Sequence, residues 1–369
     1  MLEQILKKAL QLKASDIHLK VGTKPTIRGE GGLERLEEFP VITVELMDIF
    51  LESVFKGQPK KRTELEEKGQ VDLSYTIPQV SRFRVNVYKQ RGTYAIAFRV
   101  IPFDVPLFKE LNLPPVMLET ALKHSAGLIL VTGPTGSGKS TSIASIINEI
   151  NKRSRKVIIT IEDPIEYLFK DIMCFISQRE VGLDTPSFLE GLRAALREDP
   201  DIIFVGEIRD PETAKTALHA AETGHLVFST LHTIDSVETI NRFIGMFPAE
   251  FREQVRQMLA STLLAVFSQR LVPKKDGSGK IPVVEVMIMT GTIREAILEN
   301  RLHDIPDLIE KGKSVYGSQT FDQHLEELYK KGLIDFETAL LYARKPADLE
   351  LKLRGISNAP IIGGDIIIS

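Results

Sequence analysis

A glycine-rich stretch at residues 133–141 carries the most specific chemistry in this sequence. It fits the pattern G-x-x-x-x-G-K-[ST], in which backbone N–H groups and a lysine surround the phosphates of a nucleotide. An apolar run at 128–132 precedes it and apolar residues at helical spacing follow it, so it connects a buried strand to a helix. The helix N-terminus adds a partial positive charge at the same place. The sequence therefore predicts a site for a nucleoside triphosphate.

Individual residues of this loop have expected roles. Lys139 is expected to reach the β- and γ-phosphates, and the Ser140 hydroxyl is expected to hold Mg²⁺. The glycines allow the loop to turn its N–H groups inward. The predicted nucleotide-binding residues are Gly133, Pro134, Thr135, Gly136, Ser137, Gly138, Lys139, Ser140 and Thr141.

Acidic residues follow two further apolar runs, at 157–161 and 202–205. Parallel strands deliver the residues after them to the crevice at the carboxyl edge of a sheet, beside a bound nucleotide. An NTPase needs groups there that orient or deprotonate water and support the metal. Capping of the following helices is the competing interpretation. The acidic candidates after the first run are Glu162, Asp163 and Glu166.

The second run leads to Gly206, Glu207 and Arg209. Apolar residues before an acidic position are typical of the Walker B arrangement, but glycine occupies the usual aspartate position, so that residue cannot bind the metal directly. Glu207 is the favoured candidate to polarise the attacking water, with Glu162 as the alternative. Arg209 is a local candidate for the cation that phosphoryl transfer commonly uses.

Two histidines flank another apolar run, at 226–230: His225 before it and His232 after it. If the segment is one extended strand, the seven-residue spacing separates them by ~23 Å at ~3.3 Å per residue and turns them to opposite faces. They cannot then contact the same phosphate. We expect His232, at the carboxyl end, to sense the γ-phosphate, and His225 to be structural or to lie at a subunit boundary.

The first 105 residues predict a separate α+β domain. Arg82 and Arg84 share one face of an alternating strand, and Arg99 ends the strand that is expected to pair with it. A solvated strand face is the simplest interpretation of these arginines. The expected elements are short strands at 16–20 and 26–28, a helix over about 43–56, and a hairpin of strands at 81–88 and 93–100.

Prolines indicate an interdomain linker at 106–115. From 116 to 350 strands and helices alternate, which predicts an α/β, RecA-like P-loop ATPase core with a parallel sheet and a helical C-terminal region. Within that region we expect one long helix over 250–271 and a polar turn at 274–280. Residues 351–369 are expected to form a C-terminal tail.

The bulk composition excludes several classes of protein. The 369 residues favour two domains or more, and a net charge of −3 gives no general reason to expect nucleic acid as a partner. One cysteine, Cys174, rules out an internal disulfide framework and a cysteine-rich zinc module. No apolar run approaches the ~18 residues of a membrane span, and residues 1–12 are amphipathic rather than a secretory signal. A cytoplasmic location is expected, with membrane association only through partners.

Taken together, these motifs resemble those of the type II/IV secretion ATPases, most closely the branch that retracts type IV pili. Further matching segments are residues 14–19, the arginine-bearing strand 82–86, the acidic box 160–166, the atypical Walker B 205–210 and the histidine box 223–233. The extension and type II secretion branches carry a tetracysteine zinc insertion that a chain with one cysteine cannot form. Residues 292–299, with Arg294, resemble a diverged form of the Ala-Ile-Arg-Asn-Leu-Ile-Arg-Glu segment of retraction ATPases.

This resemblance implies a homohexameric, Mg²⁺-dependent ATPase that drives pilus retraction and twitching motility. It implies an N-terminal PAS-like domain whose arginines, Arg82, Arg84 and Arg99, close on the γ-phosphate, and a partner in the inner-membrane pilus platform. The alternatives are an accessory retraction ATPase or an extension or secretion motor of the same family. A RecA-like nucleic-acid translocase and a regulatory scaffold that binds nucleotide without turnover belong to other classes.

Overall fold

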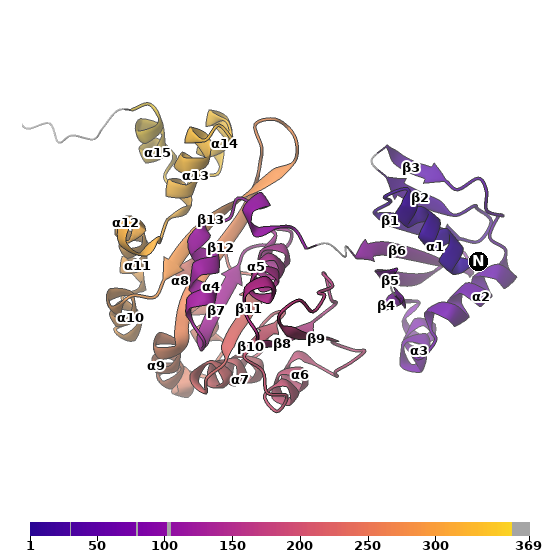
Figure 1. Cartoon of the computed structure of the whole chain (residues 1–369), viewed down its shortest axis with the longest axis horizontal. Coiled ribbons are helices and arrows are strands. Elements are labelled where there is room, and N and C mark those ends of the chain that lie inside the picture. Colours follow the sequence, from indigo (N-terminus) through magenta and orange to yellow (C-terminus); the bar gives the residue numbers. More distant parts are fainter. Residues whose placement is uncertain (30, 79, 102–104, 356–369) are drawn as a thin grey trace, which may run out of the picture. The chain divides into compact units, whose positions relative to one another are not determined.

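The structure, a computed structural model, describes residues 1–29, 31–78, 80–101 and 105–355. Residues 102–104, just before the predicted linker, and the part of the predicted tail from residue 356 onward lie outside these ranges. The chain forms two compact units (Figure 1). The first contains Met1–Val105 with the short segments Asp163–Lys170 and Glu180–Asp184, and the second contains the rest of the chain.

The first unit is built on a six-stranded antiparallel sheet in the order β3-β2-β1-β6-β5-β4. The predicted strands, the second helix and the hairpin are confirmed, whereas α3, β3 and β4 were not predicted from the sequence. The elements are α1 (Leu2–Gln11), β1 (Asp16–Lys20), β2 (Thr26–Gly29), β3 (Gly32–Arg35), α2 (Val44–Val54), α3 (Pro59–Lys68), β4 (Gln70–Ile77), β5 (Ser81–Gln90) and β6 (Thr93–Ile101).

Alternating side chains give this sheet one buried face. In β5, Phe83 and Val85 are fully buried, whereas Arg84 between them is exposed. Ile5 of α1 and Phe50 of α2 belong to the same apolar core, because helical spacing gathers their apolar residues on one side. The unit therefore has its own core.

The second unit contains a seven-stranded sheet in the order β13-β12-β7-β11-β10-β8-β9. The four strands predicted from apolar runs are confirmed, and β7 pairs in parallel with β11, β11 with β10, and β10 with β8. Strand β9 was not predicted. The bounds are β7 (Gly127–Thr132), β8 (Val157–Glu162), β9 (Phe175–Glu180), β10 (Ile202–Val205) and β11 (Leu226–Leu231).

Helices cover both faces of this sheet (Figure 1). Helices α4 and α5 pack together on one face, and α6, α7, α8 and α9 form a connected layer on the other. The strand order explains this division. The connection from β7 to β8 runs across the sheet in one direction, and the connections through β10 and β11 to β12 run in the opposite direction. Because each crossover is right-handed, helices in connections of opposite direction lie on opposite faces. The bounds are η1 (Phe108–Glu110), α4 (Pro115–Lys123), α5 (Lys139–Arg153), α6 (Phe188–Ala195), α7 (Pro211–Glu222), α8 (Ser236–Gly245), η2 (Ala249–Phe251) and α9 (Arg252–Thr262).

The expected long helix over 250–271 is wrong in its second half. Helix α9 ends at Thr262, and the chain continues as β12 (Leu263–Pro273), parallel to β7 and antiparallel to β13 (Lys280–Ile288). An apolar run alone does not distinguish a buried helix from a buried strand, and here pairing on both sides selects the strand. The predicted polar turn is confirmed, since the Lys274 N–H donates to the Gly279 carbonyl at 2.9 Å.

Helices dominate the described chain after β13, as expected. The last one extends to Leu353, so the tail expected from residue 351 begins inside a helix. The elements are α10 (Gly291–Leu298), η3 (Leu302–Asp304), α11 (Ile305–Lys311), α12 (Lys313–Tyr316), α13 (Phe321–Lys330), α14 (Phe336–Leu341) and α15 (Pro346–Leu353).

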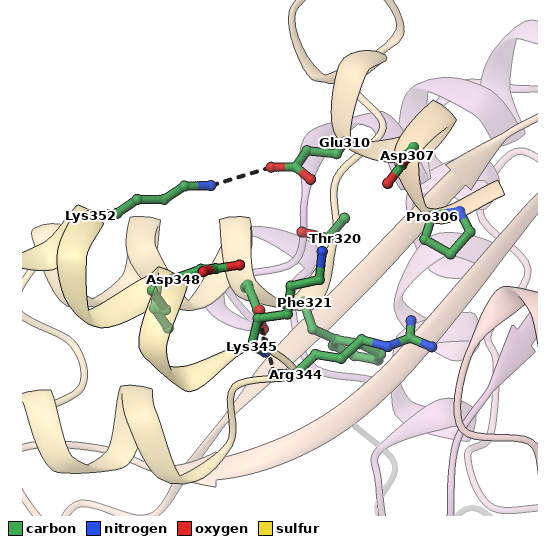
Figure 2. Close-up of a pocket in the computed structure, with 11 residues that line it drawn as sticks. Pro306, Asp307, Glu310, Thr320, Phe321, Arg344, Lys345, Asp348 and Lys352 are labelled. Carbon is green, nitrogen blue, oxygen red and sulfur yellow. Dashed lines mark hydrogen bonds and ion pairs between the residues drawn. The ribbon is translucent and has the colours of Figure 1, made fainter. Parts of the chain in front are cut away.

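A cavity lies among α11, α13 and α15 (Figure 2). Lys352 of α15 and Glu310 of α11 form an ion pair of 3.3 Å across it. None of the predicted site residues lines this cavity. One lining residue, Arg344, reaches toward β13 and α8 instead, where its guanidinium lies 3.7 Å from Glu285 and 2.9 Å from Asp235.

The Glu285 carboxylate joins β13 to the start of α8. It is 2% exposed and accepts hydrogen bonds from the Ser236 N–H at 2.9 Å and the Ser236 hydroxyl at 2.7 Å. Burial raises the pKa of Glu285, although the Ser236 hydrogen bonds and the Arg344 charge act in the opposite direction. The segment after His232 is thus attached to the C-terminal part of the sheet.

The outer edge of β13 is covered by residues 318–324. Val286 exchanges backbone hydrogen bonds with Gln319 at 2.8 and 3.0 Å, and the Gln319 side chain donates to the Val284 carbonyl at 3.1 Å. The Val284 N–H donates to Nδ1 of His324 at 2.9 Å. Burial lowers the pKa of His324 to about 4, so the ring is neutral near pH 7 and able to accept this bond.

Acid should weaken the second unit through His324. Its pKa falls from 6.5 to about 4 on folding. The stability it contributes is therefore complete above the higher value and is lost as the pH falls between the two. We expect the free energy of unfolding to drop by about 2 kcal/mol between pH 7 and pH 5 from this residue. Urea unfolding should show this slope in the wild type and a reduced slope in His324→Gln.

The control for this experiment is His303→Gln, because the His303 side chain is 80% exposed. That variant should keep the full pH dependence. Equal slopes in the wild type and His324→Gln would contradict the assignment.

In the part of the chain that the structure describes, every helix is too short or too polar to span a lipid bilayer.

Candidate nucleotide-binding and catalytic site

The predicted phosphate loop runs from the end of β7 to the start of α5. Gly133, Gly136 and Gly138 have φ values of 144°, 77° and 89°, which residues with side chains rarely adopt. Gly138 stands at the N-cap of α5, a helix of 15 residues. The sequence pattern is therefore realised as a strand, a tight loop and a helix N-terminus, the geometry that binds phosphate groups.

Lys139 opens α5 and is only 8% exposed. Its ammonium group donates to the carbonyl oxygens of Gly133 at 2.8 Å and Pro134 at 3.0 Å, so it lies against the loop itself. Ser140 and Thr141 are half-buried on the first turn of the same helix. The charge and the hydroxyl groups predicted to meet the phosphates and Mg²⁺ are thus gathered at one helix end.

Gln269 of β12 contacts this loop, and its role was missed from the sequence. Its side-chain nitrogen donates to the Ser137 carbonyl at 2.7 Å, and its side-chain oxygen accepts from the Ser142 hydroxyl at 2.8 Å. The neighbouring Ser268 accepts a hydrogen bond of 2.9 Å from Thr132, the last residue of β7. Two adjacent polar residues, Ser268 and Gln269, inside an apolar run could have indicated a contact with the site. They were not recognised because a helix was expected over these residues.

Glu207 follows β10, as predicted, and stands between two cationic or titratable groups. One carboxylate oxygen pairs with Arg209, and the other lies 3.5 Å from Nε2 of His232. The Glu207 side chain is 15% exposed, against 63% for Arg209 and 52% for His232. The structure therefore brings these three predicted residues together, with the carboxylate as the central and least exposed group.

The glycine before Glu207 has a steric reason. A Cβ on Gly206 would lie 3.1 Å from the Ile161 carbonyl oxygen and 3.2 Å from the Phe188 ring, closer than most real contacts of a Cβ. The Gly206 carbonyl also accepts a hydrogen bond of 2.7 Å from Thr230. An aspartate at this position would require the Ile161 carbonyl and the Phe188 ring to give way by a few tenths of an ångström.

Glu162 ends β8 and is held by neighbours in the same unit. One of its oxygens accepts hydrogen bonds from the Thr160 hydroxyl at 2.6 Å and from Gln178 at 3.2 Å. It is 7% exposed. Asp163 and Glu166, from the same predicted acidic box, are exposed and belong to the first unit. The box is thus divided between the two units.

The two histidines lie at opposite ends of β11, as the strand assignment predicted. His225 precedes the strand, and its Nδ1 lies 3.0 Å from the Ala220 carbonyl oxygen at the end of α7. His232 follows the strand and reaches Glu207. The two histidines therefore have different partners, one on α7 and the other on the residue after β10.

The three N-terminal arginines differ in environment. Within the first unit, Arg82 forms an ion pair of 2.7 Å with Glu180, and both side chains are nearly buried. Arg84 and Arg99 are paired across β5 and β6, and both are exposed. Arg99 also donates to Asp16 at 2.9 Å. Arg82 and Arg99 thus each have an acidic partner, and Arg84 lies beside Arg99 on the exposed side of the hairpin.

Arg294 lies on α10, outside every element that carries the loop or the carboxylates. Ile293, Ala296 and Ile297 of this helix are buried, and Arg294 is exposed. The segment is therefore an amphipathic helix that presents its arginine to solvent.

A glycine-rich loop on a mostly parallel sheet, with a carboxylate and a histidine at neighbouring strand ends, defines a P-loop nucleotide-binding protein. The family model described as type II/IV secretion system protein matches residues 1–300. The chain therefore belongs to the type II/IV secretion system protein family, and it is an ATPase of that family.

Individual relatives agree with this assignment. The chain is 44% identical over 333 residues to the type IV pilus retraction ATPase PilT of Pseudomonas aeruginosa, covering 90% of this chain and 95% of the relative. It is 42% identical to a twitching motility protein of Neisseria gonorrhoeae, covering 85% and 83%. The solved structure of the pilus retraction motor PilT with bound ADP matches with 50% identity and a TM-score of 0.84, covering 94% of this chain and 98% of that one.

Replacing the Glu207 carboxylate should separate nucleotide binding from turnover. Glu207→Gln keeps the shape of the side chain but cannot take a proton from water, so we expect ATP to bind while hydrolysis falls by about 10²–10³-fold. The measurement is steady-state phosphate release together with the nucleotide retained by the purified protein.

Glu162→Gln is the matched variant, because Glu162 is also a strand-end carboxylate and is already held by Thr160 and Gln178. It should lose less activity and should not retain ATP. If Glu162→Gln retained ATP and Glu207→Gln showed normal turnover, Glu162 would be the base that activates water and Glu207 would not.

Proposed function

We propose that this chain is a retraction motor of type IV pili, which hydrolyses ATP to drive pilus disassembly and twitching motility. The observation that carries this proposal is the identity of 44%, extending over 90% of the chain, with the retraction ATPase PilT of P. aeruginosa. The Lys139 loop and the Glu207 group supply the chemistry that such a motor needs.

The residues of the 133–141 loop are suited to a triphosphate. The Ser137 hydroxyl is buried and has no hydrogen-bond partner among the described residues. Gly136 has open space where a Cβ would stand. The loop N–H groups, the α5 N-terminus and the Lys139 ammonium hold the phosphate oxygens. Ser140 would hold Mg²⁺, which when bound neutralises charge on the β- and γ-phosphates.

Glu207 accepts the proton of the attacking water in this proposal. Arg209 pairs with one of its oxygens and holds the carboxylate in place at the end of β10, and a carboxylate is the form that acts as a base. His232, 3.5 Å from the other oxygen, is half-exposed and orients the water relative to the γ-phosphate. Glu162, at the end of β8 beside β10, supports the edge of the sheet that binds the phosphates.

The finer features of the proposal rest on the resemblance to retraction ATPases. The first unit is the PAS-like domain and the second the RecA-like core of a homohexamer, with domain bounds of 1–105, 106–115, 116–350 and 351–369. The motor works in the cytoplasm on the pilus platform of the inner membrane, and does not require nucleic acid. The arginines Arg82, Arg84 and Arg99 close on the γ-phosphate, and the exposed Arg294 face of α10 serves retraction.

Deleting the gene in its host should leave cells with excess pili and no twitching motility. Wild-type protein should restore retraction, whereas Lys139→Ala, which removes the phosphate-facing charge, should not. Pili are counted by electron microscopy and motility by colony spreading. In the same assays, Arg294→Ala should keep ATPase activity and lose retraction, because the side chain is exposed and remote from the loop along the chain. Cells without pili would instead indicate an extension motor.

The arginine proposal predicts graded losses of turnover. Arg84→Ala and Arg99→Ala should each lower the ATPase rate by at least about tenfold while the protein still assembles, because a cation on the γ-phosphate acts mainly in the transition state. Arg82→Ala should also lose turnover. Arg35→Ala, an exposed arginine of β3 in the same sheet, is the control and should keep the wild-type rate. Wild-type turnover in all three test variants would refute the proposal.

A further inference from the structure

Gln269 is tied to the phosphate loop by both ends of its side chain. The Ser137 carbonyl can only accept a hydrogen bond, so the amide nitrogen must face it, at 2.7 Å. The amide oxygen then faces the Ser142 hydroxyl, which donates to it at 2.8 Å. These two bonds fix the orientation of the amide, one on the loop and the other on the first turns of α5.

The loop is also shaped around Gln269 sterically. A Cβ on Gly133 would lie 2.2 Å from the Gln269 backbone oxygen, and a Cβ on Gly138 would lie 2.8 Å from its side-chain nitrogen. A side chain on Gly133 would therefore overlap the β12 backbone, and one on Gly138 would displace the Gln269 amide. Their positive φ values would strain other residues as well.

Gln269 belongs to a part of the unit that has little freedom to move. It is 2% exposed, on a strand that pairs with β7 on one side and β13 on the other. A buried amide is costly unless both of its ends are hydrogen-bonded, and here both ends are used on the phosphate loop. The strand therefore acts as a fixed support for a loop that lacks ladder hydrogen bonds of its own.

The Ser137 carbonyl determines the direction of a loop N–H. In a trans peptide the carbonyl of one residue and the N–H of the next point in opposite directions. Because Gln269 draws the Ser137 carbonyl toward β12, the Gly138 N–H must point away from β12. Within the described ranges that N–H has no hydrogen-bond acceptor in the chain, so it is available to a phosphate oxygen.

From these contacts we infer that Gln269 is a positioning residue for ATP hydrolysis, which orients the 137–138 peptide so that its N–H faces the phosphates. The inference rests on the proposed ATPase site and adds a residue of β12 to the motif residues. Gln269 does not touch the nucleotide in this role. It acts through the peptide that it holds.

The test is nucleotide affinity of the full chain, measured by titration calorimetry with ADP and ATP. Gln269→Leu keeps the volume of the side chain but cannot hold the Ser137 carbonyl. We expect it to bind both nucleotides about tenfold more weakly, equivalent to about 1.4 kcal/mol. Gln319→Leu is the matched control, since Gln319 is 5% exposed and its amide donates to Val284, away from the loop. It should leave affinity unchanged even where it lowers stability.

A second variant tests the direction of the hydrogen bond. Gln269→Glu can accept from Ser142, but its ionised form cannot donate to the Ser137 carbonyl. Burial raises the pKa of a carboxyl group, and the protonated acid can donate. The affinity of Gln269→Glu relative to the wild type should therefore recover as the pH is lowered, whereas that of Gln269→Leu should not. A purely structural role would not give this pH dependence.

The outcomes separate this inference from the proposed function. Wild-type affinity in Gln269→Leu, or an equal loss of affinity in Gln319→Leu, would overturn the role of Gln269 and leave the ATPase assignment standing. A pH-independent defect in Gln269→Glu would also count against it. Failure of the wild-type chain to bind ATP would refute the site itself.

Discussion

The parallel pairing of β7, β11 and β10 is the constraint on which the site depends. Their shared direction brings the phosphate loop, His232 and Glu207 to one edge of the sheet, although the chain reaches them at widely separated positions. Both faces of β7 and β11 are buried, so a slip of one residue would move every side chain to the opposite face and disturb its packing. The geometry of the site is thus a consequence of core packing.

Strands buried on both faces were the most predictable part of the fold, because they are continuous apolar runs bounded by glycine or charged residues. Strand β12 was not predictable in this way. Its apolar run follows α9 without a break, and the partners that make it a strand, β7 and β13, are distant in the sequence. Sequence patterns report burial well, but the choice between helix and strand at 263–273 is made by tertiary pairing.

The residues of the site also differ in whether local sequence patterns could predict them. Lys139 and Glu207 were identifiable because each belongs to a contiguous motif whose chemistry is local. Gln269 stands 132 positions after Ser137, and its contact with the loop depends on β12 lying beside β7. The neighbourhood of Arg209, Glu207 and His232 was partly predictable, because the sheet order determines which strand ends are adjacent, while the ion pair itself required side-chain positions.

The covering of β13 by Gln319 and His324 bears on aggregation. An uncovered edge strand presents unpaired N–H and carbonyl groups, to which a strand of another chain can add. Here the backbone groups of Val284 and Val286 that would recruit such a strand already have partners within the unit. These groups are therefore not available to a strand of another copy, which disfavours extension of the sheet along this part of the edge. At pH values near 4, charging of His324 would remove the acceptor of the Val284 N–H and so free one backbone group of this edge.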